Sequence, residues 1–385
     1  MAIVINDKKN CTGCGACWNI CPKQCIKSQR DEEGFPYPCV DKNQCIECNL
    51  CVKVCPIQQS MKHGDSKKEV YAAWSRDSEI RFKSTSGGAF TELARVILSQ
   101  GGKVIGAAYD KDNFVHHVMI SSYEEIEKVR QSKYIQSDME DVYATINKIL
   151  KSGTKVLFCG APCQVAGLKH FLQRDSKLLY TADFICRGVN SPKAYSYWLQ
   201  EMEEKFSSKV KRVWFKYKKN GWKKSPLCTR VDFDNGVTHV LNDEKNLFMI
   251  GYLRGNLYLR PSCSECHFKG ADRYSDITLA DFWKIDPKYD DDCGTSMVML
   301  NTDRGRELFE LAKDNMFVHK RTFEEIKDGN VCFDGSVTMN PKGREFLMRL
   351  GEKPFSKLVN EYTRLPLCKI IIKMIKSPIK KIVKM

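Results

Sequence analysis

The chain has 385 residues, of which 42% are hydrophobic, 28% are charged and 19 are cysteine, and its formal net charge is +15. This length allows two or three domains, and the composition excludes a disordered chain and, because no apolar run reaches ~18 residues, a membrane-spanning one. The positive balance predicts an anionic partner: a nucleic acid, a membrane surface or an anionic substrate.

The first residues, MAIVINDKKN, lack the long apolar stretch and the cleavage site of a signal peptide. We therefore expect a cytoplasmic protein. Cysteines in that compartment stay reduced, so the sequence predicts free thiols or metal-bound thiolates rather than disulfides.

Two runs of cysteines near the start share one spacing. In CTGCGACWNICP (11–22) the cysteines are separated by two, two and three residues, and a proline follows the last one. CIECNLCVKVCP (45–56) repeats this pattern. The pattern is typical of paired 4Fe-4S clusters, in which the fourth cysteine of each run ligates the other cluster. A zinc site would place a longer loop between two CxxC pairs.

The pairing rule predicts two ligand sets within residues 1–60. The first set is Cys11, Cys14, Cys17 and Cys55, and the second is Cys45, Cys48, Cys51 and Cys21. The segment resembles a bacterial two-cluster ferredoxin over its whole length, so we expect a low-potential electron-transfer domain. Cys25 and Cys39 lie outside the pattern and are expected to be small hydrophobic residues rather than ligands.

After a polar segment at 61–70, predicted to be a linker, strands and helices alternate. Strands are predicted at 70–75, 103–110, 155–160 and 178–186, and helices at 87–100, 141–152, 162–172 and 192–206. This alternation favours an α/β domain with a largely parallel sheet. From about Lys209 the chain is predicted to be β-rich, with hairpin turns at Asn220-Gly221 and Asn235-Gly236.

The stretch KSTSGGAF (83–90) places three hydroxyl residues and two glycines at the start of a predicted helix. Such a terminus binds an anion through its backbone N–H groups, or is simply capped by the hydroxyls. The sequence has no GxGxxG after a strand and no Walker loop, so a standard dinucleotide or nucleoside-triphosphate fold is not supported.

Further cysteines occur in FCGAPCQ, DFICRG and CSECHF. The first two segments follow predicted strands, where an α/β sheet presents residues at its carboxyl edge. Spacing alone leaves three interpretations open: buried free thiols, half of a zinc site at Cys263 and Cys266, or a four-thiolate site completed by that CxxC pair.

Two segments concentrate the positive charge. VKRVWFKYKKNGWKK (210–224) interleaves basic and aromatic residues, which suits a solvated strand face, single-stranded nucleic acid or a funnel for an anionic substrate. The last residues, CKIIIKMIKSPIKKIVKM, contain six lysines and no acid. We predict a basic amphipathic tail over 346–385, which contacts an anionic membrane at its inner face or docks on the protein's own core.

Five motifs in order resemble the beta-subunit family of coenzyme F-420 hydrogenases and dehydrogenases, from Tyr71 to about Leu311. They are STSGGAFTELA, SKYIQS, CGAPCQVAGLK, DFICRGVNSP and CSECHFKGADRYSDITLADFW. The resemblance implies an FAD-binding region at 71–150, and at 151–345 a third 4Fe-4S cluster with the flavin and substrate site. The implied FAD contacts are Ser86, Gly87, Gly88, Lys133, Tyr134, Gln136 and Ser137. The implied ligands of the third cluster are Cys163, Cys186, Cys263 and Cys266.

Two positions depart from the family pattern. Arg187 stands where histidine is frequent, and Ala280 stands where glycine is usual. An arginine there favours an anionic flavin or an anionic substrate over a proton-transfer role. Asp276, Thr278, Asp281 and Trp283 fit the motif, either as site residues or as a hydrogen-bonded turn.

The expected fold is an α+β ferredoxin domain followed by an α/β flavin-binding domain with a β-rich, cysteine-containing C-terminal part. The resemblance implies an FAD- and iron-sulfur-dependent oxidoreductase that exchanges electrons with coenzyme F-420 or another two-electron acceptor. The alternative is a non-catalytic electron-relay subunit of a larger redox complex. We expect a redox protein or a small-molecule acceptor as partner, no nucleic acid, and an anionic substrate; no catalytic residue is predicted.

Overall fold

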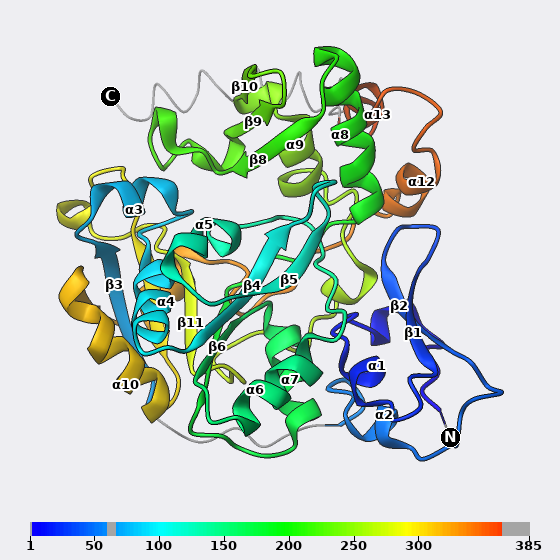
Figure 1. The fold of residues 1–385 in the computed structure, drawn as a ribbon. Helices are drawn as coiled ribbons and strands as arrows, with labels where there is room; N and C mark the ends of the chain where they lie inside the picture. The colour runs from blue at the N-terminus through cyan, green and yellow to red at the C-terminus, as the bar shows by residue number, and fades with distance from the viewer. Residues whose placement is uncertain (1, 60–66, 364–385) are drawn as a thin grey trace.

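A computed structural model describes residues 2–59 and 67–363, which are organised around three β-sheets (Figure 1). The strands are β1 (Ile26–Arg30), β2 (Pro36–Val40), β3 (Glu69–Ser75), β4 (Lys103–Tyr109), β5 (Val115–Ile120), β6 (Val156–Cys159), β7 (Leu179–Phe184), β8 (Val210–Phe215), β9 (Thr229–Phe233), β10 (Thr238–Leu241), β11 (Ile277–Asp281), β12 (Ser296–Leu300) and β13 (Met316–Arg321). The helices are α1 (Ala16–Ile20), α2 (Leu50–Lys53), α3 (Ser78–Lys83), α4 (Ala89–Ser99), α5 (Ile126–Val129), α6 (Val142–Lys151), α7 (Pro162–Leu172), α8 (Pro192–Phe206), α9 (Leu247–Leu253), α10 (Asp303–Ala312), α11 (Glu324–Gly329), α12 (Gly343–Met348) and α13 (Phe355–Thr363).

The N-terminal part is a small α+β unit of ferredoxin type. Strands β1 and β2 pair antiparallel, and the short helices α1 and α2 lie against each other beneath them (Figure 1). Helix α1 begins after Gly15 and α2 after Asn49, both with the left-handed backbone that lets a loop turn sharply into a helix. The unit lies beside α6 and α7, at the lower right of Figure 1.

The large sheet has eight strands in the order β13-β3-β12-β11-β7-β6-β4-β5 within the described residues. Only the central strands β11, β7, β6 and β4 run parallel to one another, and the remaining pairs are antiparallel. The prediction of a largely parallel sheet is therefore wrong, and the sheet is mixed. One cause is the short turn at Asp110–Phe114 between β4 and β5, which is too brief for a parallel crossover.

Helices cover both faces of this sheet because neighbouring strand residues point to opposite sides. Val104 and Leu157 pack in the core that contains α4 and α10, whereas Ile105 and Phe158 pack in the core that contains α6 and α7. The helices and strands predicted in residues 70–206 are all present, although β5 was not predicted. The large sheet therefore carries one helical layer on each face.

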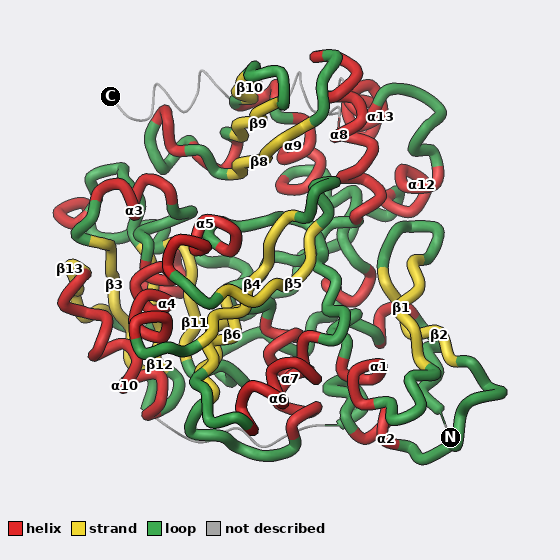
Figure 2. Tube along the Cα trace, in the orientation of Figure 1, coloured by secondary structure: helices red, strands yellow, loops and turns green. Residues whose placement is uncertain are grey.

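A third layer lies above the large sheet and contains the antiparallel sheet β10-β9-β8 with helices α8, α9 and α13 (Figure 2). Its core is mostly aromatic. Trp198 packs on Phe248 with ring centroids 5.1 Å apart, and Phe248 packs on Tyr258 at 5.3 Å. This layer closes one side of the site described below.

The two predicted hairpin turns have different outcomes. Asn235-Gly236 does join β9 to β10, with Gly236 in the left-handed region at φ 82°. Asn220-Gly221 does not form a tight turn between paired strands, so that prediction is wrong. The connection from β8 to β9 runs from residue 216 to 228 and includes two short 3₁₀ helices, because Trp222 and Lys218 are drawn into the interior.

Only the first part of the predicted basic tail, residues 346–363, lies within the described residues. Residues 346–363 are not a surface tail, since Phe346, Leu347, Phe355, Leu358 and Val359 are buried in the aromatic core. The lysine-rich segment at 364–385 lies outside the described residues. Among the described residues, none of the helices combines the length and apolar composition needed to cross a membrane.

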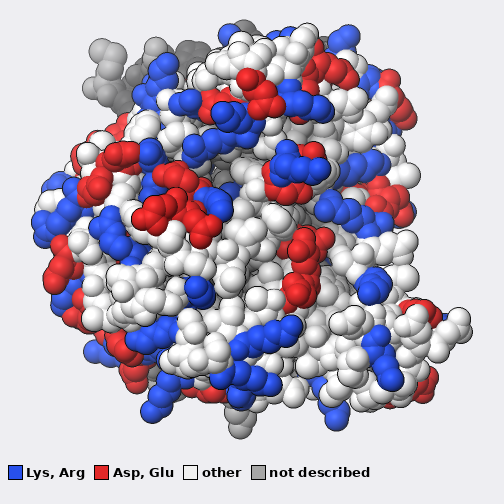
Figure 3. Space-filling model, in the orientation of Figure 1, with Lys and Arg blue, Asp and Glu red and all other residues white. Residues whose placement is uncertain are grey.

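Charge of both signs is distributed over the surface. On the face shown in Figure 3, lysine and arginine side chains are interspersed with aspartate and glutamate. The basic segment 210–224 also contributes less surface charge than its sequence suggests. Lys216 is buried in an ion pair with Asp281, and buried Lys218 donates to three backbone carbonyls.

Candidate functional site

Three groups of cysteine thiols lie in the described residues, and the first is enclosed by the ferredoxin unit. Cys17 lies within electrostatic range of Cys14, Cys11 and Cys55, the three other cysteines predicted to share its cluster. Burial raises the pKa of the Cys14 thiol to about 12. A thiol in such surroundings becomes an anion only when a metal replaces its proton, so these donors suit a metal cluster.

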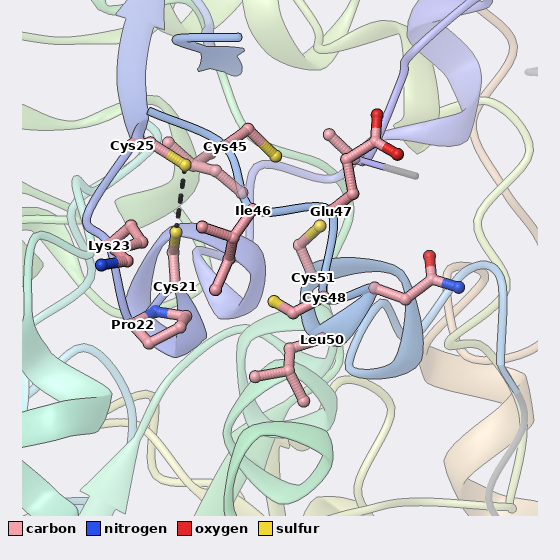
Figure 4. Close-up of a pocket in the computed structure, with 13 residues that line it drawn as sticks. Cys21, Pro22, Lys23, Cys25, Cys45, Ile46, Glu47, Cys48, Leu50 and Cys51 are labelled. Atoms are coloured by element: carbon pink, nitrogen blue, oxygen red, sulfur yellow. Dashed lines mark hydrogen bonds between the residues drawn. The ribbon is translucent and has the colours of Figure 1, made fainter. Parts of the chain in front are cut away.

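The second group lines a pocket at the outer end of the same unit (Figure 4). The wall contains all four cysteines predicted for the second cluster: Cys21, Cys45, Cys48 and Cys51. It also contains Cys25, whose sulfur lies 3.4 Å from that of Cys21. Cys25 was expected to be a small hydrophobic residue rather than a ligand, and it is indeed buried. The fold brings it beside Cys21 because the chain turns back there to start β1.

The third group draws on three distant segments. Cys163 lies in the first turn of α7, Cys186 follows β7, and the pair Cys263 and Cys266 ends and follows a 3₁₀ helix at Pro261–Cys263. Cys163 lies within electrostatic range of the other three, and burial raises its pKa well above the usual value. The structure thus brings together the four cysteines that the sequence motifs implied.

Among residues 2–59 and 67–363, no three His, Cys, Asp or Glu side chains converge as a single metal ion requires. The thiolates of a cubane each bind a different iron, so they surround a larger volume and need not converge on one point.

The first and third groups meet across a glycine. Helix α7 passes so close to the ferredoxin unit that a Cβ added at Gly167 would lie 3.0 Å from both the Cβ and the sulfur of Cys14. Cys14 is also within electrostatic range of Cys163. Trp18 Nε1 also joins the ferredoxin unit to the segment before α6, by donating to the carbonyl of Glu140 at 3.0 Å.

A cavity of about 490 Å³ lies between the large sheet and the third layer. This volume falls in the range of ~300–1,000 Å³ that small-molecule and cofactor sites usually have. One wall is the loop Ser84–Ser86 before α4, another is Lys133 and Tyr134, and Cys186 of the third group forms part of a further wall. The third thiol group therefore borders the cavity directly.

Only some of the predicted flavin contacts lie in the wall of this cavity. Ser86, Gly88, Lys133, Tyr134 and Ser137 line the cavity. Gly87 and Gln136 are not in its wall.

Gly87 packs against the neighbouring strands, where an added Cβ would lie 2.4 Å from the Ala73 carbonyl oxygen. Gln136 turns towards the ferredoxin unit and donates from Nε2 to the Thr12 carbonyl at 3.1 Å. Both are expected to act through the backbone they support rather than by touching a bound molecule.

Several wall residues carry a buried polar atom that has no hydrogen-bond partner among the described residues. These atoms are Ser84 Oγ, Thr91 Oγ1, His117 Nδ1, Arg130 Nε, Arg187 Nε and Asp281 Oδ1. Unpaired buried polar atoms are costly, and a polar ligand in the cavity would satisfy them. The wall therefore fits a molecule with several donors and acceptors.

His117 was not singled out from the sequence, because β5 itself was not predicted. Burial lowers its pKa to about 4, so the imidazole is neutral near pH 7. Its Nε2 lies 3.2 Å from the carbonyl oxygen of Cys159, another wall residue. A neutral imidazole in the wall can donate or accept a hydrogen bond without adding charge.

Arg187 occupies the position where histidine is frequent, and most of its guanidinium is already committed. One terminal nitrogen donates to the Leu253 carbonyl at 2.9 Å and to Asn256 Oδ1 at 2.7 Å. The other terminal nitrogen lies 4.0 Å from the Cys332 sulfur, and Nε has no hydrogen-bond partner among the described residues. Nε therefore remains available to an anionic group, whereas the terminal nitrogen bonded to Leu253 and Asn256 does not.

The motif around residues 276–283 has both structural and cavity roles. The Asp276 carboxylate accepts hydrogen bonds from the backbone N–H and the hydroxyl of Thr181, at 2.8 and 2.6 Å. Asp276 is buried but does not line the cavity. Asp281 and Trp283 do line the cavity, and Trp283 stacks on Trp222 with ring centroids 4.3 Å apart.

Three family models match the chain. Residues 10–58 match a 4Fe-4S dicluster domain. Residues 70–144 match the N-terminal part of the coenzyme F420 hydrogenase/dehydrogenase beta subunit, and residues 153–326 match its C-terminal part. The last two models together follow the large sheet and the third layer through most of their length.

Among curated proteins, no match is found. One of thirteen matching chains of solved structures comes from a study described as xenon derivatization of the F420-reducing [NiFe] hydrogenase complex from Methanosarcina barkeri. The alignment has 21% identity and a TM-score of 0.45, and covers 76% of this chain and 93% of that chain. A structural likeness at this level supports no conclusion about function. From the family matches, the chain belongs to the coenzyme F420 hydrogenase/dehydrogenase beta-subunit family and carries a 4Fe-4S dicluster domain at its N-terminal end.

Proposed function

We propose that this protein is an iron-sulfur flavoenzyme that passes electrons from two ferredoxin clusters through a third 4Fe-4S cluster to FAD. The FAD in turn exchanges two electrons with an acceptor such as coenzyme F-420. The observation that carries the proposal is the continuity of the thiol groups: Cys14 meets α7 near Cys163, and Cys186 of the third group borders the cavity. FAD supplies the conversion between single-electron and two-electron steps that such a chain of clusters needs.

The loop before α4 would hold an anionic part of the cofactor. Gly88, with φ 96°, directly precedes α4, and no side chain caps the first N–H groups of this helix, which can therefore meet an anion. The Ser86 hydroxyl donates to the Thr295 carbonyl at 2.7 Å, and Lys218 Nζ donates to the Ser86 carbonyl at 2.8 Å. These bonds fix the loop from behind, so its free donors face the cavity.

The opposite wall is tied to this loop. The Ser132 backbone N–H donates to Thr85 Oγ1 at 2.8 Å, which joins the loop to the segment containing Lys133 and Tyr134. Lys133 Nζ donates to the Arg130 carbonyl at 2.7 Å. The two segments that the family motifs implied for FAD thus form one hydrogen-bonded rim, on which a ribose or phosphate group would rest.

The relay interpretation is favoured by one observation. At the outer end of the ferredoxin unit, Cys48 is exposed and the neighbouring Ile46 has 56% of its surface accessible. This is a suitable entry point for electrons from a partner protein, because exposure of a cluster edge shortens the transfer distance. An obligate complex with a second redox protein would make the chain its electron-relay subunit.

Anaerobic purification tests the proposal directly. We expect about twelve iron atoms per chain, the sum of three 4Fe-4S clusters, and one FAD released on denaturation. Stopped-flow oxidation of the reduced protein by F-420, NAD(P)⁺ and oxidised ferredoxin then identifies the acceptor. Protein that contains zinc but neither flavin nor iron-sulfur clusters would contradict the proposal, whereas isolation only in a hetero-complex would favour the relay role.

The pKa of Lys133 leads us to expect that flavin binding depends on pH. Burial, with the charge of Arg212, lowers the pKa of Lys133 to about 7. A bound anionic group would raise that pKa, so binding takes up a proton and becomes weaker as the pH rises above about 7. We expect the Kd of FAD, measured by fluorescence quenching of the apoprotein, to increase by up to about tenfold per pH unit above this value.

The matched variants for this measurement are Lys133→Met and Lys128→Met. Lys128 lies on the same segment but is exposed and paired with Glu125. Lys133→Met should bind FAD with little dependence on pH between 6 and 8.5, and Lys128→Met should follow the wild type. An unchanged pH profile in Lys133→Met would exclude Lys133 as the titrating group.

A further inference from the structure

Arg260 is a buried cation at the junction between the ferredoxin unit and the rest of the protein. Its side chain is 0% exposed. Along the chain it directly precedes the 3₁₀ helix that ends at Cys263, so its backbone belongs to the loop of the third thiol group. Its guanidinium, however, extends into the ferredoxin unit. It therefore links the loops of two thiol groups.

The guanidinium meets the first thiol group at Cys11. Nε donates to the Cys11 carbonyl at 2.8 Å, and one terminal nitrogen donates both to the Cys11 sulfur at 3.6 Å and to the Pro36 carbonyl at 3.0 Å. The other terminal nitrogen donates to Gln136 Oε1 at 2.8 Å. The Tyr37 ring lies against the guanidinium carbon at 4.3 Å. The cation is thus held in a single orientation by the first cluster loop.

Gln136 extends this arrangement. Its amide accepts from Arg260 and donates to the carbonyl of Thr12, the residue after Cys11. The turn at Gly13 has φ 67°, and an added Cβ would lie 2.6 Å from the Gln136 amide nitrogen and 3.0 Å from Arg260. The cluster loop therefore passes this pair at the closest approach that a glycine allows.

Arg260 forms no ion pair with a carboxylate of the described residues. Its hydrogen-bond partners are carbonyl oxygens, one amide and one sulfur, and no ion pair involves it in the part of the chain that the structure describes. A buried cation without an anion is strongly unfavourable. A 4Fe-4S cluster with its four thiolates is a net anion, and one of those thiolates would be Cys11. The cluster itself is thus the group that can supply the missing negative charge.

We propose that Arg260 is a positioning residue that holds the first cluster against the third one and raises the reduction potential of the first cluster. The inference rests on the proposed function, since it requires a cluster at Cys11. Reduction adds one electron to the cluster and requires no proton at Arg260, so the fixed positive charge favours the reduced form. An N–H donor to a ligand sulfur acts in the same direction.

An EPR-monitored redox titration of the anaerobically prepared protein tests this role. The variants are Arg260→Gln, which removes the charge, and Arg260→Lys, which keeps it but cannot reach all four acceptors. The control is Glu265→Gln, which removes the exposed ion pair between Lys9 and Glu265 at the same junction without altering the donors to Cys11. Iron content is measured for each variant to establish how many clusters are present.

We expect one cluster of Arg260→Gln to become harder to reduce by at least tenfold in its equilibrium constant, or about 59 mV for one electron. The other clusters and the Glu265→Gln control should keep wild-type potentials. Arg260→Lys should lower the reduction potential of the same cluster by a smaller amount. If Arg260→Gln does not retain its clusters, the potential measured in Arg260→Lys tests the role instead. Unmoved potentials in the loaded Arg260 variants, or an equal shift in Glu265→Gln, would overturn the proposal. Wild-type protein without 4Fe-4S signals would instead refute the cluster assignment on which it rests.

Discussion

On the proposed function, replacement of Cys163 by serine should lower the iron content from about twelve to about eight atoms per chain, because one of the three proposed clusters loses a ligand. FAD should remain bound, since Cys163 is not in the wall of the cavity. The two ferredoxin clusters should also remain and still be reduced by dithionite. Electrons would then be unable to pass from those clusters to the flavin, and we expect acceptor reduction through them to be lost.

Cys159→Ser is the matched control for this experiment. Cys159 lies four residues before Cys163, and loss of solvent around its thiol raises its pKa to about 12. It borders the cavity but is not one of the cysteines implied as ligands. The control should keep about twelve iron atoms. Loss of iron in Cys159→Ser, or full iron content in Cys163→Ser, would require a different ligand set for the third cluster.

The second large effect is expected from Gly167→Leu on α7. The new side chain would start 3.0 Å from the Cys14 sulfur and 2.9 Å from the Tyr143 hydroxyl, so the ferredoxin unit and α7 must move apart. Overpacking of this kind costs about 1–3 kcal/mol of stability. The larger consequence is functional, because a wider gap between the first and third clusters slows electron transfer between them.

Stopped-flow absorbance distinguishes this effect from a loss of clusters. Gly167→Leu should retain the iron and flavin content of the wild type, while the reduction of FAD by electrons entering at the ferredoxin unit becomes slower. Lys169→Leu is the control, as it introduces the same side chain into the same helix at a partly exposed position. Equal rates in Gly167→Leu and the wild type would show that electrons do not cross at this contact.

The local pattern of the sequence predicts much of the fold. Four strands and four helices between residues 70 and 206 follow from the hydrophobic pattern of their own segments, whereas α3, β5 and α5 were not predicted. The mixed character of the sheet does not follow, because β5, β12 and β13 join it through pairings that no local pattern encodes. The Asn220-Gly221 dipeptide likewise has the composition of a tight turn, but burial of Trp222 and Lys218 overrides that preference.

The positions of the cysteines, too, were only partly predictable from the sequence. The repeated spacing in 11–22 and 45–56 is enough to predict a two-cluster domain, because short spacers restrict how the thiolates can be arranged. It was not enough to place Cys25 beside Cys21, since that contact depends on the turn into β1. Nor did the motifs distinguish Ser86, which lines the cavity, from Gly87 and Gln136, which do not.

The ligand chemistry of the cysteines and the order of strands and helices can therefore be predicted from short segments of the sequence, each taken by itself. The contacts between domains cannot be predicted in this way. The passage of Cys14 against Gly167, the border between Cys186 and the cavity, and the buried Arg260 at Cys11 each join segments far apart in the chain. Such contacts arise only when the domains pack, because packing decides which polar and charged groups lose water and must find a partner in one another.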